Sequence, residues 1–479
     1  MKSKCLNILI FIFLSITVFS QALSFKFGEK IPYEKNYKSI GFFKRDGKNL
    51  LFQKKTDNSC DFIVYIFNSY LKKDSKSHFL LENHKYVDII DFLGQIVLFT
   101  SYTNQEKEEE LRAYLYDNSK GFQLTKVLYK EQNKLGYKTD FVLANKVVNQ
   151  QLHVLVEMPF QNEIKEEIKY LSFDNHLEII EEYYYKLDLL GKPKRENDLI
   201  VSNNGDVVLI KKFWEKVNNF YVYKLGGTTL NEIKLSLKIR NISAIDYLYN
   251  NKNELVISGF FSSPLKYNYE GYFLQKFDEE LNLIHKNQYP INEKIKNSFK
   301  SSKEIKEGNF GLDNFYITSF RQDTSGNYFL MAEHFGKKKI KDLRYINRKG
   351  FVCIKYNKNG SYVWGCPFKT DQLELKNMFG SVFNLNQMPE PLFFYNELKN
   401  VGLRKGVPVE FGVNNYCGIN QVTFSAAGIP LIKPVKVDFP DSNQQKFAIK
   451  PKKIKTNTNH TVYICVDENY EKSMVVLVN

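Results

Sequence analysis

An internal repeat of paired hairpins is the feature that most constrains how this chain can fold. The first hairpin of a unit has two β-rich runs separated by Gly, Asn or Asp turn residues, and occurs at 42–53, 88–100, 198–211, 245–259 and 317–332. A second hairpin occurs at 62–81, 111–129, 168–185, 220–237, 271–289 and 350–368. Two hairpins make four strands per unit, and successive second hairpins begin roughly 49 to 57 residues apart up to the fifth unit.

Four antiparallel strands in a repeated unit of this length are typical of a β-propeller blade. A four-stranded sheet has two apolar faces, so neighbouring units must stack to cover them. Six units are clear, 378–437 supplies strands for a seventh, and the tail 459–479 adds a hairpin that completes a blade begun at the N-terminus. We therefore predict an all-β fold in which 21–479 forms a single β-propeller domain of four-stranded antiparallel blades. Seven blades are favoured, six or eight are alternatives, and a two-domain β-sandwich also fits.

One polar insertion and three charged runs interrupt the pattern. Residues 292–315 are rich in Lys, Glu, Ser and Asn and lie between the fifth and sixth units. They are either a solvated insertion or a lid over one end of the propeller, because long loops of repeat folds gather on the functional face. The runs 105–110, 336–341 and 450–455 are predicted to be exposed loops or sheet edges.

The N-terminus has the pattern of an export signal. Lys2 and Lys4 precede the apolar run Leu6 to Phe19, and small residues follow in "VFSQA". We predict a signal peptide over 1–20 and an exported chain that is periplasmic, outer-surface or extracellular; an uncleaved N-terminal anchor is the alternative. Nothing later is both long and uncharged enough for a transmembrane segment, which needs about 20 residues.

The composition of the chain limits the classes of partner that it is expected to bind. The chain of 479 residues is 43% hydrophobic and 15% aromatic, enough for a packed core, and carries a formal charge of +15. Only eight of its 68 basic residues are arginine, the residue favoured for bidentate base and phosphate recognition. We therefore expect no nucleic-acid binding, and consider an envelope protein or an acidic polysaccharide as possible partners.

Motifs for established enzyme chemistry are missing from the sequence. It contains no zinc-protease helix, nucleophile elbow, EF-hand or dinucleotide fingerprint, and the loop at 41–49 departs from a P-loop in spacing and lacks the magnesium-binding hydroxyl. The seven histidines show no metal-ligand spacing. We expect no cofactor and no metal, and name no catalytic residue.

Aligning the units on their first turn brings one residue from each into a common column. The column contains Lys54, Ser101, Glu157, Lys212, Phe260 and Glu333. Glu157 and Glu333 stand where hydrophobic runs end, and a buried carboxylate there needs a partner such as a lysine. One interpretation is that these residues are strand ends exposed to solvent. The alternative is that they form a ring of mixed charge near one mouth of the propeller, which would suit a polar ligand.

Aromatic residues supply the other candidates for ligand binding. Trp214 ends a strand, Trp364 lies in the hairpin 350–368, and Tyr395 and Asn396 belong to "FFYNELKN". Such rings stack on sugars or anchor peptides, but at this spacing they also pack between blades. The predicted ligand-binding residues are Glu157, Lys212, Glu333, Trp214, Tyr395 and Asn396.

Two cysteines flank the Asn-Gly turn of the hairpin 350–368. With Asn359-Gly360 as a two-residue turn, Tyr356 pairs with Val363 and Cys353 pairs with Cys366. The cysteine pair is then non-hydrogen-bonded, with Cα atoms about 4.5 Å apart, at the short end of the disulfide range. In an exported protein this predicts a cross-strand disulfide, with two packed thiols as the alternative.

Three segments of the C-terminal third share a pattern of strand ends, turns and aromatic residues: "SFRQDTSGNYFLMAEHF" (319–335), "GFVCIKYNKNGSYVWGCPFKTDQ" (350–372) and "LFFYNELKNV" (392–401). In these segments the chain resembles a group of uncharacterised secreted β-propeller-like proteins of Bacteroidetes, and the resemblance is clearest over about 315–479. It implies the fold and an envelope or extracellular location, and it implies no activity.

Three functions remain open. The first is a binding or interaction scaffold for a glycan or protein partner. The second is a polysaccharide-acting hydrolase or lyase at a channel mouth, which predicts acids and a base converging in one pocket. The third is a surface adhesin, which predicts a separable C-terminal sorting module.

Overall fold

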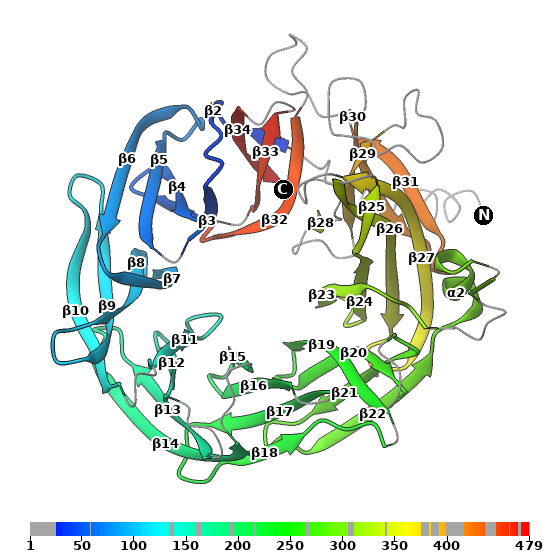
Figure 1. The fold of residues 1–479 in the computed structure, drawn as a ribbon, viewed down its shortest axis with the longest axis horizontal. Coiled ribbons are helices and arrows are strands. Elements are labelled where there is room, and N and C mark those ends of the chain that lie inside the picture. The colour runs from blue at the N-terminus through cyan, green and yellow to red at the C-terminus, as the bar shows by residue number, and fades with distance from the viewer. Residues whose placement is uncertain are drawn as a thin grey trace, which may run out of the picture.

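The computed structural model describes residues 25–478 except 58, 134–137, 160–163, 191–194, 215–216, 239, 264–267, 302, 305–310, 341–342, 375–382, 385–391, 399–415, 436–446, 459 and 468–470. Its strands form seven hydrogen-bonded sheets arranged in a ring (Figure 1). The largest sheet has nine strands and contains two groups of strands, so the described chain has eight groups, which we call blades 1 to 8. The first strand of a blade lies nearest the centre of the ring (Figure 1).

Blades 1 to 4 follow one another along the chain without exchange of strands. Blade 1 contains β3 (Tyr37–Arg45), β4 (Lys48–Lys55), β5 (Cys60–Phe67) and β6 (Lys73–Leu81). Blade 2 contains β7 (His84–Phe92), β8 (Gln95–Thr103), β9 (Glu108–Asp117) and β10 (Gly121–Gln132). Blade 3 contains β11 (Asp140–Leu143), β12 (Leu152–Glu157), β13 (Lys165–Phe173) and β14 (Ile179–Leu190). Blade 4 contains β15 (Arg195–Val201), β16 (Val207–Trp214), β17 (Asn218–Leu225) and β18 (Asn231–Lys234).

Blades 5 to 8 keep this order with one added strand and one exchange. Blade 5 contains β19 (Asn241–Tyr249), β20 (Leu255–Ser262), β21 (Gly271–Phe277) and β22 (Leu283–Pro290). Blade 6 contains β23 (Phe315–Gln322), β24 (Tyr328–His334), β26 (Leu343–Tyr356) and β27 (Tyr362–Glu374), with β25 (Gly336–Ile340) added beside β26. Blade 7 contains β28 (Phe383–Asn384), β29 (Phe393–Leu398), β30 (Tyr416–Phe424) and β31 (Pro430–Val435). Blade 8 contains β32 (Phe447–Thr456), β33 (Thr461–Asp467) and β34 (Lys472–Val478), joined by β1 (Phe25–Phe27) and β2 (Ile31–Pro32).

The hydrophobic core is divided among the gaps between blades. Eight clusters of buried residues are present in the described chain, each formed mainly by two consecutive blades. One cluster packs Phe42 and Tyr65 of blade 1 against Val462 and Val475 of blade 8. The last blade therefore stacks on the first, and the ring of apolar interfaces is closed.

The two ends of the chain meet in blade 8. Strand β1 pairs antiparallel with β34, with Phe25 opposite Val478. Strand β32 also pairs in parallel with β3 over two residues, beginning at Gly41 and Lys455. The prediction that the tail hairpin completes a blade with N-terminal residues is confirmed, and this pairing covers a sheet edge that would otherwise be exposed.

The all-β propeller and its four-stranded antiparallel blades are confirmed, whereas the favoured count of seven blades is not. The structure has eight groups of strands in the described residues, one of the alternatives considered above. The blade missing from the favoured count is blade 8. Its first strand, β32, contains 450–455, which was predicted to be an exposed loop or edge but carries the buried Ile454. The run 105–110 was also misjudged in part, since Glu109 and Glu110 are buried.

The hairpin at 350–368 has its predicted strands but a different turn. Instead of a two-residue turn at Asn359-Gly360, the Asn357 N–H donates to the Ser361 carbonyl oxygen at 2.8 Å. Tyr356 consequently pairs with Tyr362 and not with Val363, and a register shift follows. The physical reason is an irregularity beside the turn, which absorbs one residue of the second strand.

The insertion at 292–315 begins with helix α2 (Glu293–Phe299), on the outer side of the ring (Figure 1). The Asn292 side chain accepts a hydrogen bond from the Ile295 N–H and caps this helix. Ile295 and Phe299 are buried in the cluster between blades 5 and 6. This part of the insertion is therefore packed on the blades and is not a lid. Among the described residues, no helix is long and apolar enough to cross a membrane.

Candidate functional site

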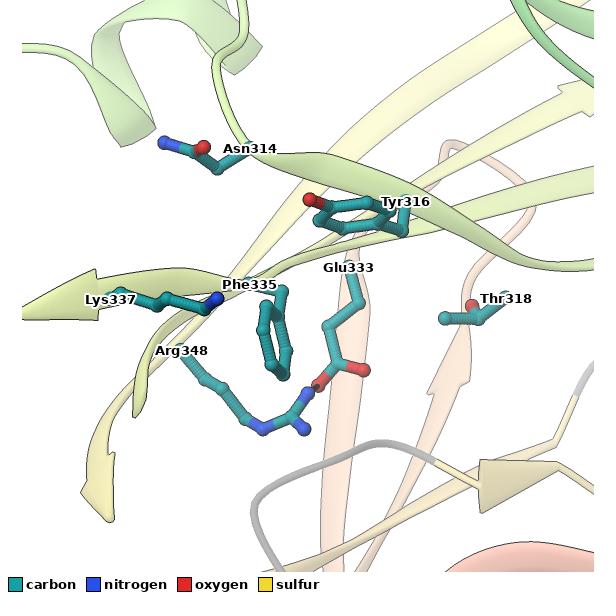
Figure 2. Close-up of a pocket in the computed structure, with 7 residues that line it drawn as sticks. All are labelled: Asn314, Tyr316, Thr318, Glu333, Phe335, Lys337 and Arg348. Atoms are coloured by element: carbon teal, nitrogen blue, oxygen red, sulfur yellow. Dashed lines mark ion pairs between the residues drawn. The ribbon is translucent and has the colours of Figure 1, made fainter. Parts of the chain in front are cut away.

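A cavity of about 680 Å³ opens at one end of blade 6, and we call it the blade-six cavity. Strands β23, β24, β25 and β26 contribute most of its lining, which consists of Asn314, Tyr316, Thr318, Glu333, Phe335, Lys337 and Arg348 (Figure 2). One of them, Glu333, belongs to the predicted column. The volume lies in the range of about 300–1,000 Å³ that small-ligand sites occupy.

A buried ion pair lies at this cavity. The Arg348 Nη1 atom is 3.0 Å from the Glu333 Oε1 atom, and the two side chains point toward each other (Figure 2). Both side chains are nearly excluded from solvent, at 6% and 4% exposure. A pair so buried is costly to separate, because the remaining charge would lack a counter-ion. The cavity therefore has a polar wall whose charges are held in place before any ligand arrives.

A bulge lies beside Arg348 in the pairing of β26 with β27. The pairs Arg348–Gln372 and Gly350–Lys369 leave one residue of β26 opposite two of β27, so the extra residue belongs to β27. Gly350 has φ +133°, and a Cβ atom there would lie 1.9 Å from the Phe368 carbonyl oxygen. Only glycine fits this conformation and this close approach, so the bulge beside Arg348 depends on Gly350.

Aromatic rings and one cation complete the site. Tyr316 is 57% exposed, and its ring meets that of Phe335 edge to face with centroids 5.9 Å apart. The guanidinium carbon of Arg348 lies 5.1 Å from the centroid of Phe335. Lys337 is exposed at the wall. The cavity thus combines an accessible aromatic surface, a positive charge and fixed polar groups, which suits a hydroxylated or anionic ligand.

Lys212 lies in a different place, beside a cavity of about 320 Å³ that we call the inner cavity. This cavity is bordered by the first strands of blades 4, 5 and 6, among them residues Glu196, Asp246 and Ile317. Lys212 pairs with Glu196, with their Nζ and Oε2 atoms 3.0 Å apart. Lys212 and Glu333 therefore do not share one cavity.

Carboxylates converge on the inner cavity. Asp198, Asp246 and Glu196 all line it, and the Tyr247 hydroxyl donates to Asp198 Oδ2 at 2.5 Å. Burial raises the pKa of Asp246 to about 6, and the negative charge of Asp198 adds to this rise. One carboxyl group here is thus more easily protonated than an ordinary aspartate.

Glu157 belongs to a buried polar network between blades 3 and 4. Its Oε1 atom accepts a 2.6 Å hydrogen bond from Asn197, whose Oδ1 atom accepts one of 3.0 Å from the Lys211 Nζ atom. Lys211 in turn lies 2.8 Å from both carboxylate oxygens of Glu166, and both side chains are fully buried. Glu157 lines neither cavity described above, and its observed contact is structural.

Two of the predicted ligand-binding residues, Tyr395 and Asn396, do not line these cavities. Tyr395 is buried, and its hydroxyl accepts a 3.0 Å hydrogen bond from Asn420. Asn396 is fully buried and exchanges two hydrogen bonds with the backbone of Ile449, which links blades 7 and 8. The side chain of Trp214 lies outside the described residues. Ligand binding by these three positions stays a prediction, and the contacts of Tyr395 and Asn396 are those of core packing.

The predicted cysteine pairing is present. Cys353 and Cys366 lie directly opposite each other in β26 and β27, and both are buried. Both thiols are free in this structure, and burial raises the pKa of each. The disulfide between them stays a prediction.

Several residues at these sites were not singled out from the sequence. They are Tyr316, Phe335, Lys337 and Arg348 at the blade-six cavity, and Asp198 and Asp246 at the inner cavity. The one available signal was the charge at Lys337, which was assigned to an exposed edge. Within the described residues, no group of three or more His, Cys, Asp or Glu side chains is arranged to hold a metal ion.

No protein-family model matches the chain, and no curated protein matches it. Solved structures similar to it include a protein of unknown function from Bacteroides caccae, with 10% identity over 67% of this chain and 94% of that chain and a TM-score of 0.31. Prolyl oligopeptidase B from Galerina marginata matches with 11% identity over 91% of this chain and a TM-score of 0.41, and the match spans only 56% of the peptidase. The β-propeller domain of the Trilobed protease from Pyrococcus furiosus matches with 11% identity over 70% of this chain and 98% of that domain, with a TM-score of 0.32. None of these similarities assigns an activity, a ligand or a partner to this chain.

Proposed function

We propose that this protein is an exported, envelope-associated binding propeller that holds a glycan, preferably an acidic one, in its blade-six cavity. The observation that carries the proposal is the buried Glu333–Arg348 pair beside the accessible ring of Tyr316. Export is inferred from the pattern of 1–20, which lies outside the described residues.

Each wall of the cavity has a counterpart in such a ligand. The exposed ring of Tyr316, set against Phe335, offers a flat apolar surface for the C–H face of a sugar. Asn314 and Thr318 add polar side chains to the lining. Lys337 supplies a positive charge for a carboxylate or sulfate, and the net charge of +15 attracts polyanions over longer distances.

Binding of the purified chain to an array of uronate-containing, sulfated and neutral oligosaccharides tests the proposal, followed by calorimetry on the glycans that bind. Tyr316→Ala should weaken binding to every glycan ligand at least tenfold, because it removes the stacking surface. Lys337→Ala should weaken acidic ligands and leave neutral ones nearly unchanged.

The matched controls are Tyr70→Ala, which removes a ring that is 77% exposed in blade 1, and Lys72→Ala beside it. Neither should change binding. Equal effects of Tyr70→Ala and Tyr316→Ala, or binding to no glycan class on the array, would overturn the glycan assignment.

A second candidate function, a polysaccharide-acting hydrolase or lyase, is favoured by the inner cavity. Asp246 with its raised pKa and the neighbouring Asp198 have the unlike environments expected of a general acid and a base. Release of reducing ends or unsaturated products from acidic polysaccharides tests this function. Asp246→Asn should abolish turnover without weakening glycan binding at the blade-six cavity, whereas activity that survives in Asp246→Asn would exclude this role.

A further inference from the structure

One end of the ring carries most of the exposed apolar side chains. We call it the turn face, the end at which the first and third strands of each blade finish and the second and fourth strands begin. Sixteen large apolar residues are exposed in the described part of the chain. Eleven lie in the turns of this face or in the first four residues after them, four lie at the opposite end, and one lies midway along a strand. Apolar residues exposed singly are ordinary, but their concentration at one end indicates an interaction surface.

The fourth strands of three alternate blades begin in the same way. Residues 179–180 of blade 3, 283–284 of blade 5 and 431–432 of blade 7 are pairs of adjacent aliphatic side chains, each side chain 41% to 51% exposed. Blades 1, 2, 6 and 7 add the single side chains Tyr70, Leu93, Leu124, Val363 and Ile429. Because these blades point outward in different directions around the ring, a single partner reaches all of them only from the turn face (Figure 1).

The charges of the turn face differ from blade to blade. In blade 1 the exposed lysines outnumber the exposed acids, Lys44, Lys48, Lys72 and Lys73 against Asp46 and Asp74. In blade 3 the described residues of this face expose three acids and no lysine, the acids being Glu178, Glu181 and Glu182. Glu178 already pairs with Lys126 of blade 2, whereas no cation of the described chain lies within ion-pair distance of Glu181. Blade 5 exposes two acids and one lysine, Glu279, Glu280 and Lys252, and blade 7 exposes Lys433.

We propose that the turn face binds a second copy of this chain, face to face, about a two-fold axis that lies in the plane of the ring and passes through blades 2 and 6. Since the eight blades follow one another around the ring (Figure 1), this axis sets blade 1 of each copy against blade 3 of the other, and blade 5 against blade 7. Axes through blades 1 and 5 or through blades 3 and 7 set a charged blade against itself. The axis through blades 4 and 8 sets the basic blades 1 and 7 together and the acidic blades 3 and 5 together.

The proposed axis matches both the charges and the apolar side chains. The lysines of blade 1 meet the glutamates of blade 3, and Lys433 meets the acids of blade 5. In the same two contacts Tyr70 meets residues 179–180, and residues 283–284 meet 431–432. The blade-six cavity lies near the start of a first strand, β23, at the opposite end of the ring, so this association leaves it open.

Sedimentation equilibrium of the purified chain over a range of concentrations tests the proposal. It should show a reversible monomer–dimer equilibrium that weakens as salt is added. Ile180→Ser should raise the dissociation constant of the dimer at least tenfold, because an apolar side chain is lost from both copies of the interface. The matched control is Leu190→Ser, at the other end of the same strand, where the side chain is 48% exposed against 46% for Ile180. It should leave the dissociation constant unchanged.

Charge reversal in two chains tests the axis itself. Lys72→Glu with Lys73→Glu in one variant, and Glu181→Lys with Glu182→Lys in another, should each turn both contacts between blades 1 and 3 into like-charge contacts. Each variant alone should therefore dimerise at least tenfold more weakly than the original chain. A mixture of the two should associate again, because the reversed blade 1 of one chain meets the reversed blade 3 of the other, and the second contact is unaltered.

A monomer at every concentration, equal effects of Ile180→Ser and Leu190→Ser, or a mixture of charge variants that does not associate would each overturn the proposal. A monomer that sediments with phosphatidylcholine vesicles, and no longer does so as Ile180→Ser, would assign the turn face to a lipid surface instead. Tyr316→Ala should leave the dimer unchanged, and Ile180→Ser should leave the calorimetric affinity for glycans unchanged. The dimer and the glycan proposal are therefore tested separately.

Discussion

Replacement of Lys211 by methionine should destabilise the protein far more than the same change at the next residue. The Lys211 ammonium lies 2.8 Å from both carboxylate oxygens of Glu166 and 3.0 Å from Asn197, and neither side chain of the ion pair is exposed. Lys211→Met leaves the Glu166 carboxylate buried without its counter-ion. Breaking a buried ion pair in this way costs about 3–5 kcal/mol.

The size of the chain converts this cost into a modest but measurable shift of melting temperature. At about 2.1 cal/mol/K per residue, a chain of 479 residues unfolds with an entropy of about 1 kcal/mol/K. A loss of about 3–5 kcal/mol should therefore lower Tm by about 3–5 °C if the ring unfolds as one unit. Differential scanning calorimetry reports both this shift and the cooperativity of the transition.

The matched control is Lys212→Met, which removes a lysine that is 37% exposed and pairs with Glu196. An exposed ion pair contributes only about 0–1 kcal/mol, so Tm should move by no more than about 1 °C. The double variant Lys211→Met with Glu166→Leu should recover most of the loss, because both buried charges are then gone. Equal shifts for Lys211→Met and Lys212→Met, or no recovery in the double variant, would refute the reasoning.

Three further predictions concern other parts of the ring. Non-reduced protein without residues 1–20 should show three free thiols on denaturation if Cys353 and Cys366 form the predicted disulfide, and a count of five would exclude it. Burial raises the pKa of Asp246 to about 6 from an unfolded value near 3.8. Protonation of Asp246 therefore contributes fully to stability below about pH 4, and this contribution is lost as the pH rises through 6. Asp246→Asn should therefore stabilise the protein by up to about 3 kcal/mol at pH 8 and by little at pH 4, in urea titrations at both pH values; an equal effect at both would contradict this. Gly350→Ala should destabilise the protein by about 1–3 kcal/mol and weaken glycan binding, because a Cβ cannot adopt φ +133° beside the Phe368 carbonyl; unchanged Tm and binding would show that the bulge does not need glycine.

Eleven hairpins of the first six units could be predicted because each carries its own turn residues between two β-rich runs, whereas the hairpin of β11 and β12 was not predicted. Blade 8 could be predicted only in part: its tail hairpin was expected to join N-terminal residues, as β34 and β1 do, but its first strand was not expected. Its first strand, β32, contains the sequence "KPKKIK", which has the composition of an exposed edge. The strand forms there because Ile449 and Ile454 are buried and because β3 pairs alongside it, and both are long-range effects.

The predicted column identified strand ends correctly, but the lysine that forms the buried ion pair of blade 4 is Lys211 and not Lys212 of the column. In "VVLIKKFW" both faces of β16 are covered by neighbouring blades, so the apolar residues do not alternate and the sequence does not show which lysine points inward. The partner of Glu333 was equally hidden. Phe351, and not Arg348, is the residue of β26 directly opposite Glu333, so strand pairing alone does not reveal the Arg348–Glu333 ion pair.

Three buried polar links lie at one end of the strands. Glu109 bonds Ser101 and Thr103 in blade 2, Lys211 bonds Glu166 across blades 3 and 4, and Arg348 bonds Glu333 in blade 6. All three contacts occur where a second strand ends or a third strand begins. The buried charges of these contacts already have polar partners. The same charges placed within the apolar clusters between blades would break the packing that holds the ring together. A polar ligand is therefore best received at this end, where the blade-six cavity opens.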